Sequence, residues 1–226
     1  MLLAIDTSTG TASVALVQDS EVIAELTWRS EQNHTVELLP SLVYLIKQAK
    51  MNLRSASGII VARGPGSFNG LRVGVSAAKG LAFSLGVPIV GISTMEVEAY
   101  PHAEIGLPIC PIFNAGRDEI ATALFQKQDG EWQRLAAEHI TTVDVLCSQI
   151  ANKTLFCGEF IPVIYSRLKE RLKDRAVIPD AASRLRRAGF LAELGIKRMK
   201  AGDYDSVATL QPVYLRRPPI TEPKRR

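Results

Sequence analysis

The first residues that could do chemistry form a polar run near the N-terminus, Asp6-Thr7-Ser8-Thr9-Gly10-Thr11. Hydroxyl groups and backbone amides at the tip of a strand can bind a phosphate, and a carboxylate can hold Mg²⁺ through water. The same residue types also cap their own backbone in a polar hairpin turn. Both interpretations stay open, and the candidate cofactor-binding residues are Asp6, Thr7, Ser8 and Thr9.

A second candidate is the glycine-rich segment 64–74, which follows an apolar run and opens an expected helix. Ser67 is well placed to cap that helix. A helix N-terminus after a glycine-rich turn can bind an anion in principle. The segment is not a P-loop, because no Gly-Lys-Ser/Thr follows the glycines.

Cysteine and histidine are too scattered to build a site of their own. The three cysteines form no CxxC pair, and the three histidines have no HxxH or HxxxH spacing. A disulfide framework, a structural zinc site and a metal site made of protein ligands alone are therefore not expected. Reduced cysteines fit a cytoplasmic protein. The cysteines are Cys110, Cys147 and Cys157, and the histidines are His34, His102 and His139.

Composition indicates a folded, water-soluble chain of 226 residues, with 46% hydrophobic and 22% charged residues. The longest stretch without a charged residue, 80–95, is interrupted by a proline and three glycines. It falls short of the roughly 20 apolar residues that a spanning helix needs. The N-terminus has no basic flank and too short an apolar run for a signal peptide. We expect no membrane association.

The net charge of +4 is unevenly distributed. Residues 1–104 hold 7 basic and 9 acidic side chains, whereas residues 105–226 hold 20 basic and 14 acidic ones. The excess lies in 167–200 and in the tail 216–226. Such a half could attract RNA. The alternative is a solvated helix face plus a disordered, proline-containing tail, since no aromatic residues interleave the basic ones.

Hydrophobic periodicity predicts two successive α/β units. The first has strands at 2–6, 12–17, 22–28, 58–62 and 87–92 and helices at 34–50 and 67–85. The second has strands at 107–113, 120–126, 132–136 and 155–157 and helices at 142–151, 165–173 and 181–201. The proline-marked segment 100–108 is the expected hinge. This gives a first lobe, 1–104, a second lobe, 105–215, and a basic tail, 216–226.

Two helices of the first lobe carry unusual faces. The helix at 67–85 places small residues at helical spacing, and each interior glycine costs about 1 kcal/mol relative to alanine. Either tight packing on its own sheet or a contact with another subunit would offset that cost. The helix at 34–50 has two apolar stripes where one suffices for a core. These features favour a partner surface on the two helices. Mainly because of the family resemblance given next, we expect that surface at Leu38, Leu42, Leu45, Gly70, Gly74 and Ala77.

The segments 3–8 and 64–74 resemble the TsaB (YeaZ) family of bacterial tRNA threonylcarbamoyladenosine synthesis. Shorter similarities at 34–40, 90–94 and 212–216 support this. The resemblance implies the two-lobed fold of actin, sugar kinases and heat-shock ATPases, with a reduced second lobe. It also implies a non-catalytic subunit that pairs with TsaD through first-lobe helices. TsaD is a catalytic paralogue that modifies tRNA, and the ATPase TsaE joins the pair.

The residues at the family's catalytic positions indicate that this chain is not the enzyme. TsaD holds its metal with an HxxxH pair after the fifth strand, and Thr94 and Glu98 stand there in this sequence. The segment 114–118 lacks the hydroxyls of a second phosphate loop. Two residues depart from the family, with Asn69 in place of a usual threonine and Asn114 in place of a usual aspartate. The second departure weakens any metal-nucleotide site.

The resemblance therefore predicts a scaffold that activates TsaD, forms a homodimer when alone, and meets tRNA only through the complex. It predicts no cofactor of its own, with ATP and magnesium used only in the complex. The first alternative is a small ATPase or kinase of the same fold that uses Asp6 and the turn at 7–11. The second is a glycoprotease-like peptidase built around Ser67.

Overall fold

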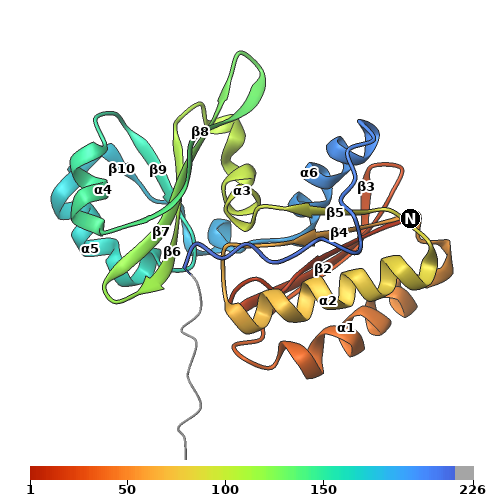
Figure 1. Cartoon of the computed structure of the whole chain (residues 1–226). Coiled ribbons are helices and arrows are strands. Elements are labelled where there is room, and N and C mark those ends of the chain that lie inside the picture. Colours follow the sequence, from red (N-terminus) through yellow and green to blue (C-terminus); the bar gives the residue numbers. More distant parts are fainter. Residues whose placement is uncertain (217–226) are drawn as a thin grey trace, which may run out of the picture.

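The computed structural model describes residues 1–216, so the predicted tail lies outside the described residues from 217 onward. The chain forms two lobes, each built on a five-stranded mixed sheet (Figure 1). None of the helices in residues 1–216 has both the length and the apolar character needed to cross a bilayer.

The first lobe contains β1 (Leu2–Asp6), β2 (Thr11–Gln18), β3 (Glu21–Arg29), α1 (His34–Gln48), β4 (Gly58–Ala62), α2 (Phe68–Leu85) and β5 (Ile89–Ile92). Next come α3 (Thr94–Ala99) and a 3₁₀ segment, Tyr100–Ile105, where the hinge was predicted. The second lobe contains β6 (Ile109–Gly116), β7 (Glu119–Gln128), β8 (Glu131–Thr141), α4 (Val143–Gln149), β9 (Thr154–Cys157), α5 (Ile161–Leu172) and β10 (Ala176–Val177). Ala181–Arg184 is a 3₁₀ segment, and α6 (Ala188–Lys200) follows.

The two sheets are built on one plan. The first has the strand order β3-β2-β1-β4-β5, and the second has the equivalent order β8-β7-β6-β9-β10. In each sheet the first three strands are antiparallel, and the last two run parallel to the first strand. The two sheets confirm the predicted two-lobed α/β fold, and their common strand order is a finding of the structure.

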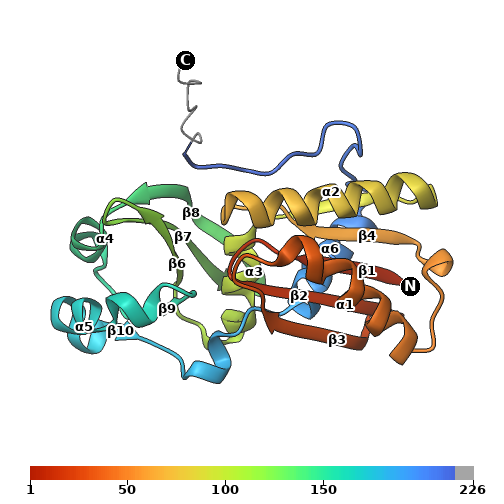
Figure 2. The ribbon, with the colours of Figure 1, turned by 90° about the horizontal axis from the view of Figure 1, so that it is seen from below.

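Helices cover both faces of the first sheet (Figures 1 and 2). Alternate residues of a strand point to opposite faces. Leu3 and Ile5 of β1 therefore pack with α1 and α2, whereas Ala4 packs with α6. The second sheet is covered in the same way, by α4 and α5 on one face and by α3 on the other.

The predicted boundary between the lobes needs a correction at its C-terminal side. The second lobe was expected to run from 105 to 215, but α6 packs on the first sheet through Leu191 and Ala192. The chain then stays on the first lobe, where Leu210 joins the core and the Val213 amide donates to the Arg63 carbonyl at 2.7 Å. The second lobe therefore ends before α6.

The predicted helix at 181–201 is also interrupted. Leu185 and Arg187 adopt extended backbone, and α6 begins only at Ala188. Its first amides find acceptors on the first lobe, because Ala188 N donates to Ser13 Oγ and Gly189 N donates to Glu25 Oε1, both at 2.9 Å. Orphan amides at a helix start need such acceptors, so the position where α6 begins is set by tertiary contacts.

The small face of α2 packs on its own sheet. A Cβ atom added to Gly70 would overlap the Thr7 carbonyl oxygen, and one added to Gly74 would overlap Thr7 Oγ1. The Thr7 hydroxyl donates to the Gly70 carbonyl at 2.7 Å. Ser67 caps α2 as predicted, since its hydroxyl accepts from Gly70 N at 3.3 Å. Close approach of β1 therefore explains the glycines.

This packing predicts opposite effects for two identical substitutions in α2. Gly70→Ala should lower the free energy of unfolding by about 2–3 kcal/mol, because the Thr7 backbone must move. Gly80 is exposed and has nothing within 4 Å of its added Cβ. Gly80→Ala should therefore raise stability by about 0.5–1 kcal/mol through helix propensity. Urea unfolding measures both, and a Gly70→Ala variant as stable as the unaltered protein would contradict the close approach.

Candidate functional site

An arginine lies buried between the lobes and gathers the polar residues of the candidate site. Arg186 stands in the extended stretch before α6, and its side chain is 3% exposed. Its Nε donates to Asp6 Oδ2 at 2.6 Å, and Nη1 donates to Glu98 Oε2 at 3.1 Å. Nη2 donates to Thr9 Oγ1 at 2.7 Å and to Ser8 Oγ at 3.2 Å. The side chains that accept these hydrogen bonds from the guanidinium come from β1, the β1–β2 turn and α3.

Charge around the guanidinium is unbalanced toward the negative side. Burial raises the pKa of Glu98 to about 7, against the opposing effect of Arg186, and Glu159 and Asp6 push it in the same direction as burial. Burial by itself lowers the pKa of Arg186, but Asp6 and Glu98 outweigh that effect and raise it. The arginine therefore stays charged, and Glu98 is the group of this cluster that titrates near neutral pH.

Asp6, Ser8 and Thr9 lie together, but their side chains bind the Arg186 guanidinium. A phosphate or Mg²⁺ was one of the two interpretations of this turn. Asp6 Oδ1 also accepts from Ser8 N at 2.9 Å and from Ser8 Oγ at 2.6 Å. Thr7 is buried elsewhere, against α2. Because a guanidinium and the turn's own backbone use these oxygens, the turn does not fit a metal-bound phosphate.

Sequence reasoning missed Arg186. It lies in the run Arg184-Leu185-Arg186-Arg187, which was predicted to be the start of a helix. The neighbouring Arg187 is half exposed and pairs with Glu25. Nothing in the residue types separates the buried arginine from its neighbours, because the separation depends on contacts with residues more than 80 positions away.

The two residues at the positions of the expected metal-binding pair have internal roles. Thr94 Oγ1 accepts from Gly64 N at 3.0 Å, and Glu98 pairs with Arg186. Both side chains are buried. Within residues 1–216, no group of three or more His, Cys, Asp or Glu side chains is arranged to hold a metal ion.

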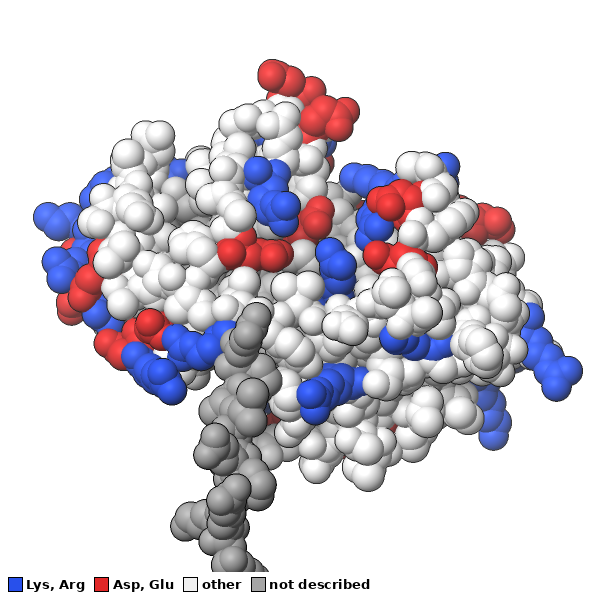
Figure 3. Space-filling model, in the orientation of Figure 1, with Lys and Arg blue, Asp and Glu red and all other residues white. Residues whose placement is uncertain are grey.

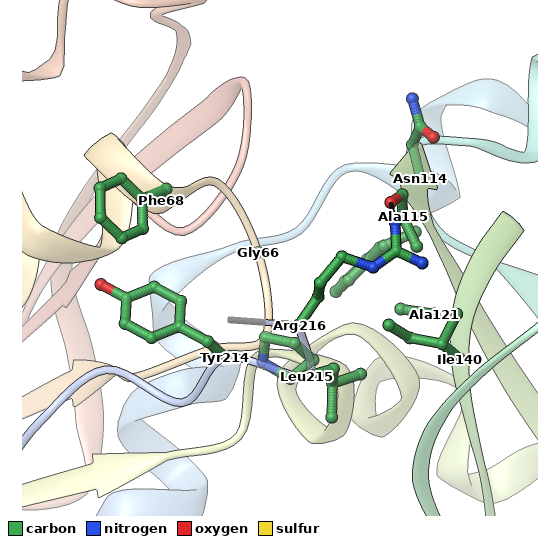
Figure 4. Close-up of a pocket in the computed structure, with 11 residues that line it drawn as sticks. Gly66, Phe68, Asn114, Ala115, Ala121, Ile140, Tyr214, Leu215 and Arg216 are labelled. Carbon is green, nitrogen blue, oxygen red and sulfur yellow. Dashed lines mark hydrogen bonds between the residues drawn. The ribbon is translucent and has the colours of Figure 1, made fainter. Parts of the chain in front are cut away.

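A mostly apolar pocket of about 340 Å³ opens beside this cluster, between the start of α2 and the second sheet (Figure 4). Phe68 and Tyr214 form one wall, with ring centroids 5.1 Å apart. Arg216 crosses to the opposite wall, where it pairs with Glu119 and donates to the Ala115 carbonyl at 3.2 Å. One side of the pocket is therefore lined by residues 214–216.

The corresponding turn of the second lobe is also satisfied locally. Asn114 Oδ1 accepts from Gly116 N at 2.8 Å, and Asn114 is exposed at the rim of the pocket. Arg117 and Asp118 have positive φ angles and form the tip of the β6–β7 turn. These residues form a short hairpin turn in which the asparagine caps its own backbone.

Several arginines of the basic stretch 167–200 form internal ion pairs. Arg167 and Arg171 bind Asp144, and Arg198 binds Asp203 and Asp205. On the face in Figure 3, acidic side chains lie among the basic ones, with no single basic patch. This arrangement favours the alternative of a solvated helix face over a continuous surface for RNA.

The predicted partner surface must be corrected residue by residue. Leu38, Leu42 and Leu45 are core residues that are at most 5% exposed. Gly70 and Gly74 are buried under β1, and Ala77 is partly buried. Because Leu38, Leu42, Leu45, Gly70 and Gly74 are covered, these five residues are not a contact surface, whereas Ala77 stays a prediction.

The second apolar stripe of α1 is the exposed one. Val36, Leu39 and Val43 are 52–69% exposed, and Tyr44 lies beside them at 55%. On the adjacent helix α2, Phe83 is 82% exposed. We call these five residues the outer helical face. The helices α1 and α2 lie side by side on one face of the first sheet (Figures 1 and 2).

Comparisons with known proteins agree over nearly the whole chain. The family described as "TsaD: tRNA N6-adenosine threonylcarbamoyltransferase" matches residues 21–220. The tRNA threonylcarbamoyladenosine biosynthesis protein TsaB of Bacillus subtilis is 34% identical over 95% of this chain and 93% of its own length.

Solved structures agree with the fold. YeaZ from Pseudomonas aeruginosa has a TM-score of 0.79 and 28% identity, over 95% of this chain and 99% of its own. A ROK hexokinase from Thermus thermophilus has a TM-score of 0.51 at 10% identity, over 87% of this chain and 99% of its own. The hexokinase supports the two-lobed fold alone.

The raised pKa of Glu98 predicts a pH dependence of stability. An unfolded glutamate titrates near 4.5 and the folded one near 7, so the folded state holds the proton more tightly. Stability should therefore fall by about 2 kcal/mol as the pH rises from 5 to 8. Urea unfolding at both pH values measures this, and Glu98→Gln should remove most of the difference. Equal pH slopes for the variant and the unaltered protein would show that Glu98 is not the titrating group.

Proposed function

Because the chain belongs to the TsaB family, we propose that it is a non-catalytic subunit that binds and activates a TsaD-type threonylcarbamoyltransferase. The modification in which it takes part is the N6-threonylcarbamoylation of adenosine in tRNA. The observation that carries the proposal is the outer helical face, which is apolar, exposed and not used by the core.

The outer helical face has the properties of a protein interface. Large exposed apolar side chains at Val36, Leu39 and Val43 recur at helical spacing, on the side of α1 opposite its core residues. On α2, the exposed residues Ser76 and Gly80 are small enough for another helix to approach closely. Contiguous exposed apolar surface of this kind marks interaction sites in soluble proteins.

A partner with the same fold would present equivalent helices to this face. The family match to TsaD indicates that the catalytic subunit shares this architecture. Two such helix pairs, packed face to face, would bury the apolar residues of both proteins. Without TsaD the face is free to pair with a second copy of the chain around a two-fold axis, which gives a homodimer.

The polar groups of the cleft support a non-catalytic role. Asp6, Thr94 and Glu98 are all bound to groups of the protein itself. A stand-alone ATPase or kinase would need Asp6 for its metal, and a peptidase would need Ser67, whose hydroxyl caps α2. ATP and magnesium then belong to the assembled complex, which includes a TsaE-type ATPase and meets tRNA. We place this assembly in the cytoplasm.

Reconstitution tests this function directly. The purified chain should form no threonylcarbamoyladenosine in tRNA by itself, and it should restore synthesis when added to TsaD, TsaE, ATP, tRNA and a threonylcarbamoyl donor. Size-exclusion chromatography should show a homodimer that converts to a heteromer with TsaD. Nucleotide hydrolysis or tRNA modification by the isolated chain at a comparable rate would overturn the proposal.

The outer helical face yields a specific variant with a matched control. Val43→Lys places a charge at the centre of the face and should weaken TsaD binding at least about tenfold, because a charge would have to be desolvated there. Val163→Lys introduces the same change at another exposed helical valine, 72% exposed on α5, and should leave binding within about twofold. Calorimetric titration with TsaD measures both affinities. Equal affinities would place the interface elsewhere.

A further inference from the structure

We infer that Arg186 is a positioning residue for the outer helical face. It binds both α3, which packs on the second sheet, and the β1–β2 turn, which holds the starts of α1 and α2. The inference rests on the proposed function in one respect, because the proposed function names TsaD as the partner of the outer helical face. The coupling itself is a property of this chain and can be measured without the partner.

On the side of the second lobe, the anchor for Arg186 is α3. Met95 and Ala99 of this helix pack in the core beneath the second sheet. Glu98 lies between them, and its backbone carbonyl accepts from the Cys157 thiol of β9 at 3.6 Å. The carboxylate that binds Arg186 is thus fixed to the second lobe through its own backbone.

On the side of the first lobe, the anchor is the β1–β2 turn, and this turn holds the starts of both interface helices. His34, the first residue of α1, makes a hydrogen bond through Nε2 to the Thr9 carbonyl at 2.8 Å. The amide of Ser67, which caps α2, donates to the Ser8 carbonyl at 2.7 Å. Residues whose side chains bind Arg186 therefore hold the helix starts with their backbone.

Burial makes this link rigid. A buried guanidinium is tolerated only when charged and polar partners surround it, and removing it leaves the buried side chains of Asp6, Thr9 and Glu98 without the donor that they share. The turn would then move away from α3 and carry with it its hydrogen bonds to α1 and α2. The affinity for the partner depends on the relative placement of these helices. Loss of Arg186 should therefore lower the affinity at the outer helical face, although the arginine does not contact that face.

The test compares Arg186→Ala with Arg187→Ala. Each variant removes one of two adjacent arginines, but Arg187 is half exposed and its ion pair is with Glu25 of the first lobe. Amide hydrogen exchange is measured on the isolated chain well below its unfolding temperature. Arg186→Ala should speed exchange at least about tenfold in residues 7–11 and at the starts of α1 and α2, while β6 and β9 stay protected. Arg187→Ala should leave exchange in these segments unchanged.

A second measurement separates positioning from general loss of stability. Affinity for TsaD should fall about tenfold for Arg186→Ala and stay within about twofold for Arg187→Ala. Millimolar guanidinium chloride should restore part of the lost affinity by occupying the vacated site, whereas equal sodium chloride should not. Guanidinium lowers general stability, so a variant that is merely unstable would not recover.

The outcomes distinguish this inference from the proposed function. Unchanged exchange in the turn of Arg186→Ala overturns the inference even if TsaD binds the outer helical face. An unaltered chain that does not bind TsaD overturns the proposed function, while faster exchange still supports the coupling. If Arg186→Ala does not fold, Arg186→Lys replaces it. A lysine can pair with Asp6 but cannot reach all four acceptors, so an intermediate effect is expected, and no effect would overturn the inference.

Discussion

A buried guanidinium places the strictest demand on this structure. Arg186 is almost completely removed from water and binds Asp6 and Glu98 together. A charge in such a place is stable only if its partners are positioned around it. One partner belongs to the first sheet and the other to a helix that packs on the second. The packing of the two lobes therefore supplies the polar partners that replace water around the Arg186 side chain.

The path of the chain after the second sheet follows from the same demand. Arg186 reaches the cleft only because residues 185–187 are extended. The chain then enters the first lobe, where Ser13 and Glu25 supply acceptors for the start of α6. Packing of α6 on the first sheet completes a layered lobe with helices on both faces. The first lobe is thus closed by a segment more than 80 residues away from its last strand.

The two lobes share a plan but present different outer surfaces. In the first lobe, α1 carries a stripe of exposed apolar residues opposite its core side. In the second lobe, Arg167 and Arg171 of α5 pair with Asp144, and Val163 of the same helix is exposed. The cleft between the lobes is bounded by the protein's own side chains and by its C-terminal segment. The outer helical face is an exposed apolar surface of the first lobe that its core does not use.

Much of this architecture could be predicted from the chain because its causes are local. Period-two and helical patterns predicted nine of the ten strands within residues 1–216 as well as helices α1 and α2, and Ser67 showed where α2 is capped. The two apolar stripes of α1 were also visible. Their roles could not be assigned, because an apolar side chain on either stripe looks the same until the sheet covers one of them. Arg186 was hidden for the same reason. Whether an arginine is solvated by water or by two carboxylates depends on contacts across 88 and 180 positions, and such contacts exist only after the two lobes have packed.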